Sequence, residues 1–92
     1  MAKYKILIAD DHAMIRDGIK ALLKNNKEYQ VMGEAVNGVE AVEKYKTMQP
    51  DLVILDISMP EMNGMEASRK ILEADSNARI IMLSMHDDED YI

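Results

Sequence analysis

The chain has 92 residues and a formal net charge of −6; 48% of its residues are hydrophobic and none is cysteine. This length allows one small domain, residues 1–92, and the negative charge disfavours binding of the segment to a nucleic-acid backbone. Without cysteine there is neither a disulfide framework nor a thiolate metal site. No apolar stretch approaches the roughly 20 residues of a membrane-spanning helix, and the N-terminus lacks an apolar signal region, so we expect a cytoplasmic domain.

Strand-like and helix-like segments alternate along the chain. Apolar runs predict strands at residues 6–9, 52–55 and 78–83, and the mixed pattern of residues 29–36 predicts an edge strand. Helical spacing predicts a helix from Ala13 to about Lys24. Right-handed crossovers would then place helices on both faces of a parallel sheet.

Two further helices should open at similar asparagine-glycine pairs, Asn37-Gly38 and Asn63-Gly64. In each, the asparagine can cap the helix and a glutamate three residues later can reach back. The expected inward-facing residues are Val39, Val42 and Tyr45 on the first of these helices and Met65, Ile71 and Leu72 on the second. The acidic run at 87–90 predicts the start of one more helix, since negative charge favours a helix N-terminus.

Acidic residues follow two of the apolar strands. Asp10 and Asp11 come directly after Ile6–Ala9, and Asp56 comes directly after Leu52–Leu55. If these strands are parallel neighbours, the three carboxylates converge at the edge where open α/β sheets bind ligands. Crowded carboxylates repel one another, and a hard divalent cation such as Mg²⁺, which prefers oxygen ligands, relieves that repulsion.

These motifs resemble the receiver domain of two-component response regulators. The resemblance covers the segments 6–11 and 52–60, the turn at 60–64, and Leu83-Ser84. Asp11-His12 followed by Arg16-Asp17-Gly18-Ile19 is similar to the NarL/FixJ branch, in which a helix-turn-helix DNA-binding domain follows the receiver. The resemblance implies a flavodoxin-like (CheY-like) α/β fold of three layers, with strand order 2-1-3-4-5.

The resemblance also implies roles for particular residues. Asp56 would accept a phosphoryl group from a sensor histidine kinase. Asp11 would bind Mg²⁺, Asp10 would bind it directly or through water, and the backbone carbonyl of Ser58 would be a further ligand. Ser84 would contact the phosphoryl group and move on activation.

Simpler interpretations exist for the same residues. Asp56 and Asp11 could be helix caps, and Ser84 could be a turn residue. His12 could shuttle protons, but the favoured interpretation is an ordinary residue in the first turn of a helix.

The chain departs from the family pattern at its C-terminal end. A receiver has a fifth strand that carries a lysine, and a fifth helix, and the resemblance finds neither here. We therefore expect a truncated receiver whose phosphorylation is impaired and whose DNA-binding domain is absent. The uncovered edge of the fourth strand, Arg79–Leu83, predicts a dimer or higher oligomer, formed by pairing of fourth strands or by swapping of elements between chains. The alternatives are a self-assembling structural fragment without signalling activity and a small Mg²⁺-dependent phosphatase with an aspartate nucleophile.

Overall fold

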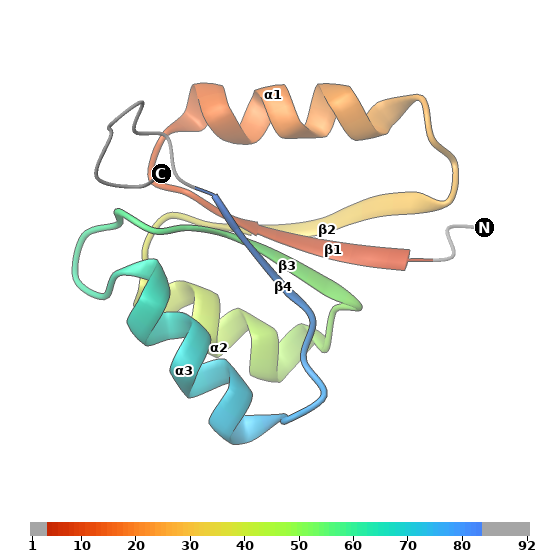
Figure 1. Cartoon of the computed structure of the whole chain (residues 1–92). Coiled ribbons are helices and arrows are strands. Elements are labelled where there is room, and N and C mark those ends of the chain that lie inside the picture. The colour runs from red at the N-terminus through yellow and green to blue at the C-terminus, as the bar shows by residue number, and fades with distance from the viewer. Residues whose placement is uncertain (1–3, 84–92) are drawn as a thin grey trace.

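The computed structural model describes residues 4–83, in which strands and helices alternate (Figure 1). The strands are β1 (Tyr4–Ala9), β2 (Tyr29–Ala35), β3 (Leu52–Asp56) and β4 (Ile80–Leu83). The helices are α1 (Ala13–Lys24), α2 (Gly38–Met48) and α3 (Gly64–Ala74). The expected elements are therefore present, while Ser84 and the helix start expected at 87–90 lie outside the described residues. None of the helices described is long and apolar enough to cross a membrane.

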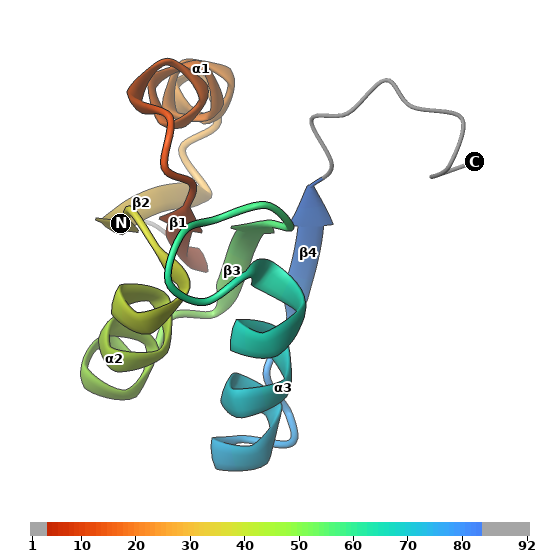
Figure 2. The same cartoon turned by 90° about the vertical axis from the view of Figure 1, so that its left-hand side faces the viewer.

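The strands form one parallel sheet in the order β2-β1-β3-β4. Figures 1 and 2 show α1 on one face of the sheet and α2 and α3 on the other. This arrangement confirms the expected flavodoxin-like fold with a layer of helices on each face, and it confirms that residues 29–35 form an edge strand. The chain passes from β1 to β2 on one side and then to β3 on the other, so the topological switch point lies between β1 and β3.

The central strands are apolar throughout because helices cover both faces of the sheet. Leu7 and Ala9 point into the larger core on the side of α2 and α3, whereas Ile6 and Ile8 point into a smaller core on the side of α1. All four residues are at most 1% exposed. A strand buried on both faces has no need for alternation of polar and apolar residues, which explains the continuous apolar run in the sequence.

The inward faces of α2 and α3 differ in part from those expected. Val39, Met65 and Leu72 are 39%, 63% and 41% exposed, so their placement in the core was wrong. Small residues take much of the inner surface instead, which lets the helices approach each other and the sheet closely. The residues buried on these two helices are Gly38, Ala41, Val42, Tyr45, Gly64, Ala67 and Ile71.

The asparagine caps are formed as expected. The side chain of Asn37 accepts a hydrogen bond from the backbone N–H of Glu40 at 2.8 Å, and that of Asn63 accepts one from Glu66 at 2.9 Å. The Glu40 carboxylate reaches back and accepts from the N–H of Val36 at 3.2 Å. Each cap satisfies backbone donors that the first turn of a helix leaves unpaired, so both helix starts are determined locally.

The fourth strand starts later than the apolar pattern indicates. The N–H of Ala78 donates to the carbonyl of Asp75 within a turn, and pairing with β3 begins at the carbonyl of Arg79, which accepts from Val53 at 3.0 Å. β4 lies at the edge of the sheet among the residues described, and Ile81 on it is 46% exposed.

Candidate functional site

The carboxyl ends of β1 and β3 bring the acidic residues together. Ala9 pairs with Leu55 across the two strands, so Asp10 and Asp56 follow at neighbouring positions of the sheet edge. This edge is the switch point of the fold, where the loops leave the sheet in opposite directions and a ligand can enter.

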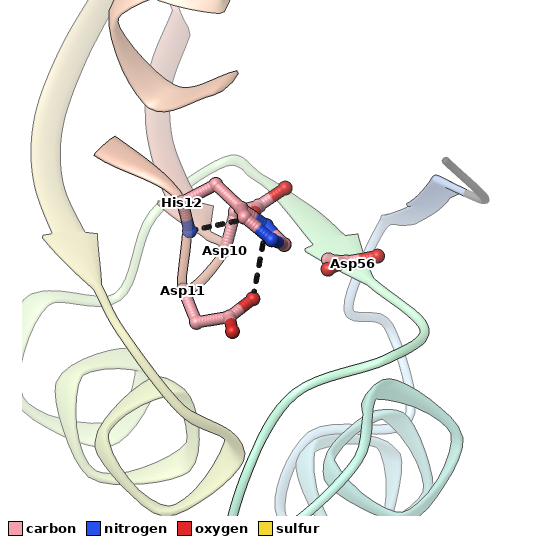
Figure 3. Close-up of side chains that lie close together, drawn as sticks. All are labelled: Asp10, Asp11, His12 and Asp56. Atoms are coloured by element: carbon pink, nitrogen blue, oxygen red, sulfur yellow. Dashed lines mark hydrogen bonds and ion pairs between the residues drawn. The ribbon is translucent and has the colours of Figure 1, made fainter. Parts of the chain in front are cut away.

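Four side chains form an acidic cluster there, which we define as Asp10, Asp11, His12 and Asp56 (Figure 3). One possible ligand atom from each lies within 4.8 Å of those of the others. The expected convergence of three carboxylates is therefore present. Three oxygen donors at such spacing can share one hard cation, although acidic groups also gather without one.

Asp10 is completely buried, and its two carboxylate oxygens have different surroundings. Oδ1 accepts from the backbone N–H of His12 at 2.8 Å and lies 2.9 Å from Nδ1 of the same residue. No hydrogen-bond donor within residues 4–83 reaches the buried Oδ2. Because an unpaired buried carboxylate oxygen is costly, this atom is suited to a ligand that residues 4–83 do not supply.

Asp56 is 2% exposed and ends β3. Burial, and after it the negative charge of Asp10, raises the pKa of the Asp56 carboxyl above its ordinary value, while the N–H of Ser58, 3.3 Å from Oδ1, acts in the opposite direction. Within residues 4–83, the negative charge of the Asp56 carboxylate is therefore only partly compensated. A positive charge beside it would favour the ionised form.

His12 has a larger part in the cluster than the sequence indicated. Its ring is 60% exposed, and Nδ1 lies 3.1 Å from Oδ1 of Asp11 as well as near Asp10. The hydrogen bond to Asp10, followed by the charge of Asp11, raises the pKa of the His12 imidazole. In the sequence, the hint of this role was the position of His12 directly after Asp10 and Asp11. His12 precedes α1 as its N-cap residue instead of lying in the first turn.

The structure excludes the simple capping interpretations. The N-cap position of α1 is His12 and that of α3 is Asn63, so neither Asp11 nor Asp56 caps these helices. The capping role that the simpler interpretation gave to the carboxylates of Asp11 and Asp56 is therefore filled by other residues.

Two glycines hold the loop 57–63, which follows Asp56 and contains Ser58. A Cβ on Gly64 would come closer than 3.0 Å to the backbone carbonyl of Asp56, and a Cβ on Gly38 would come equally close to that of Met62. The N–H of Gly64 also donates to the carbonyl of Ile57 at 2.8 Å. The loop is thus closed tightly on itself and on α2, which limits the positions open to Asp56 and Ser58.

The fold and the cluster define a parallel α/β domain with carboxylates at its switch point. Comparison with known families then identifies the class: the chain belongs to the response regulator receiver domain family, whose model matches residues 6–92. Members of this family are signalling domains of two-component systems and not turnover enzymes.

Relatives include transcription regulators and chemotaxis proteins. The chain is 38% identical over 90 residues to the transcriptional regulatory protein DegU of Brevibacillus brevis, covering 98% of this chain and 38% of DegU. It is 50% identical over 80 residues to the chemotaxis protein CheY of Thermotoga maritima, covering 87% of this chain and 66% of that CheY. The chain thus spans less than two thirds of the first and about two thirds of the second.

Solved structures agree with this classification. A LuxR-family two-component response regulator from Aurantimonas sp. SI85-9A1 superposes with a TM-score of 0.88 at 33% identity, covering 98% of this chain and 64% of that one. A chain of the CheX-CheY-BeF3-Mg+2 complex from Borrelia burgdorferi superposes with a TM-score of 0.86 at 34% identity, covering 97% of this chain and 67% of that one.

Proposed function

We propose that this receiver domain accepts a phosphoryl group from a sensor histidine kinase on Asp56, with Mg²⁺ bound at the acidic cluster. The observation that carries the proposal is the buried Asp10, whose Oδ2 lacks a donor among the described residues and whose carboxylate belongs to a cluster with two others. Membership in the receiver family supports the same conclusion.

The residues at the cluster fit Mg²⁺ by their chemistry. The carboxylates of Asp10, Asp11 and Asp56, with the backbone carbonyl of Ser58, offer the oxygen donors that Mg²⁺ prefers, and such sites keep several waters. Once bound, the ion would neutralise negative charge on the transferring phosphoryl group. No cysteine competes with the oxygen donors, since the sequence has none.

Asp56 would act as the nucleophile. One of its carboxylate oxygens forms a bond to phosphorus, the bond from phosphorus to the imidazole nitrogen of the donor breaks, and the electron pair stays on that nitrogen. The backbone N–H of Ser58, already directed at Asp56, is placed to hold the carboxylate during transfer. The hydroxyl of Ser84 would contact the phosphoryl group, as expected from the family motif.

What the phosphorylated receiver acts on is a separate question. DegU is named as a transcriptional regulator, and we propose by analogy that phosphorylation of this receiver controls a DNA-binding domain outside these 92 residues. The higher identity to CheY favours a second candidate, in which the phosphorylated receiver signals through direct contact with another protein. Comparing capture of proteins and of promoter DNA by the complete natural protein separates the two.

The test of the central proposal is phosphorylation of the chain with acetyl phosphate and MgCl₂. Intact mass spectrometry should show one added phosphoryl group, which is labile at alkaline pH and located on Asp56 by borohydride reduction. Asp56→Asn should prevent the addition, whereas Glu73→Gln, a control at an exposed carboxylate of α3, should not. Stable phosphorylation elsewhere, or none with Mg²⁺ present, would contradict the proposal. Continuous hydrolysis of p-nitrophenyl phosphate would favour the phosphatase alternative.

We also propose that the 92-residue chain self-associates through β4. Within residues 4–83 this strand pairs only with β3, and Ile81 is 46% exposed on it. An apolar strand edge with free backbone groups is a template for pairing with another chain. A two-fold pairing of β4 with its copy is the simplest closed arrangement.

A further inference from the structure

Arg16 connects the acidic cluster to the edge of the sheet. It lies near the start of α1, and its side chain is 16% exposed. Nη1 donates to the backbone carbonyl of Asp10 at 2.7 Å, and Nε donates to Oε1 of Glu34 at 2.9 Å. A guanidinium presents its N–H groups in a rigid planar fork, so bonds to two different groups determine its orientation.

Glu34 is the anchor of this arrangement. It belongs to β2 and pairs with Ile8 of β1 in the register of the sheet. Its second carboxylate oxygen accepts from Nζ of Lys20 at 2.9 Å. The hydrogen bond from Lys20, together with that from Arg16, holds the pKa of Glu34 below its ordinary value despite partial burial. Glu34 is therefore a charged, doubly paired acceptor on a fixed strand.

The bond from Arg16 constrains the peptide between the first two acidic residues. The N–H of Asp10 donates to the carbonyl of Ala35 at 3.0 Å, while the carbonyl of Asp10 accepts from Arg16. That carbonyl shares a planar peptide unit with the N–H of Asp11. Holding its oxygen therefore holds the plane of the peptide and the direction in which the chain leaves β1.

We propose that Arg16, anchored by Glu34, is a positioning residue that orients the peptide between Asp10 and Asp11 so that both carboxylates face Asp56. A simple ion pair between α1 and β2 does not require this arginine, because Lys20 already supplies one to Glu34. A lysine at position 16 would keep the charge but lacks the fork that joins Glu34 to the Asp10 carbonyl. The consequence for Mg²⁺ rests on the function proposed above.

The first experiment uses the chain without metal. Triple-resonance NMR measures the ¹³C shift of the Asp10 carbonyl, which reports its hydrogen bond directly. Arg16→Lys should change this shift, and Lys20→Gln should leave it at the wild-type value because Lys20 contacts Glu34 but not Asp10. Thermal unfolding of each variant verifies that it is folded; if Arg16→Lys is unfolded, Glu34→Gln provides the test, because it weakens the anchor and retains Arg16.

The second experiment is an NMR titration with MgCl₂ that follows the amide of Asp11. Arg16→Lys should weaken Mg²⁺ binding about tenfold, the lower end of the effect of residues that orient metal ligands, while Lys20→Gln should change it less than about twofold. Loss of protein stability alone would not separate the two variants in this way.

The outcomes are distinguishable. An unchanged Asp10 carbonyl in Arg16→Lys, or an equal loss of Mg²⁺ affinity in Lys20→Gln, would overturn the positioning role. If the wild-type chain shows no saturable Mg²⁺ binding, the function proposed above and the metal half of this inference both fail. The carbonyl shift would still decide whether Arg16 orients the peptide.

Discussion

Replacing Asp56 by Asn should stabilise the metal-free chain at neutral pH, although most substitutions of buried residues destabilise a protein. Asn has the same shape and its side-chain oxygen can still accept the hydrogen bond from Ser58. What the substitution removes is a buried negative charge that two neighbouring carboxylates repel. The raised pKa of Asp56, caused first by burial and then by Asp10, is the sign of that cost.

The magnitude follows from the spacing of the charges. With oxygens of neighbouring carboxylates within 4.8 Å, Coulomb's law gives about 3.5 kcal/mol for each pair at an effective dielectric of about 20 and about 1 kcal/mol in bulk water. The side chain of Asp11 is 33% exposed, so solvent screens its repulsion of Asp56, and a protonated His12 would offset some of the remaining repulsion. We therefore expect a gain of about 1–3 kcal/mol in the free energy of unfolding.

The pH dependence gives the effect a second signature. A raised pKa means that native Asp56 holds its proton more tightly than the unfolded chain does. Ionisation of this residue therefore lowers the stability of the wild type as pH rises through the unfolded and then the folded pKa. The advantage of Asp56→Asn should be largest at neutral pH and should shrink as the pH falls through the raised pKa.

Urea unfolding followed by circular dichroism measures the difference. Glu73→Gln is the control, because it changes the net charge equally at an exposed position of α3 and should alter stability by less than about 0.5 kcal/mol. At ten times its dissociation constant, Mg²⁺ should stabilise the wild type by about 1.4 kcal/mol and the variant by less. An Asn variant less stable than the wild type at pH 7 without Mg²⁺ would refute the argument from charge crowding.

Two further predictions concern the loop after Asp56 and the sheet edge. Gly64→Ala should destabilise the chain by about 2–4 kcal/mol and shift the NMR signals of Asp56, because the new Cβ would collide with the backbone of Asp56. The control Ser68→Ala, on the same helix, should cost less than about 1 kcal/mol, and similar losses of stability in both variants would count against the tight loop. Sedimentation equilibrium of the wild type should show a mass above that of the monomer. Ile81→Lys should reduce this mass, whereas Met65→Lys, a control at an exposed position of α3, should not. A monomeric wild type would exclude pairing through β4.

Within residues 4–83, the sequence was sufficient to predict the order of the elements and the starts of α1, α2 and α3. Local rules decide these features: uninterrupted apolar runs predict buried strands, and Asn37 and Asn63 cap the helices that follow them. The positions of Asp10 and Asp56 at strand ends were equally visible. Parallel pairing of the two strands then makes convergence of the carboxylates a consequence of topology.

The inward faces of α2 and α3 could not be predicted from hydrophobicity alone. Met65 and Leu72 are more apolar than Gly64 and Ala67, but the closeness of the neighbouring backbone favours the small residues. Which stripe of a helix becomes buried depends on the space left by its neighbours, and that space exists only after the elements have packed.

The detail of the site was likewise decided by tertiary contacts. No spacing rule specifies that His12 approaches the carboxylates of both Asp10 and Asp11 or that Arg16 donates to the Asp10 carbonyl. Nor does one specify that Oδ2 of Asp10 is buried without a donor from residues 4–83. Glu34 can accept the hydrogen bond from Arg16 only because β2 lies beside β1 and under α1. Local propensities determine which residues begin and end each element, whereas burial, charge pairing and hydrogen-bond satisfaction depend on groups that are distant in the chain and meet only in the folded molecule.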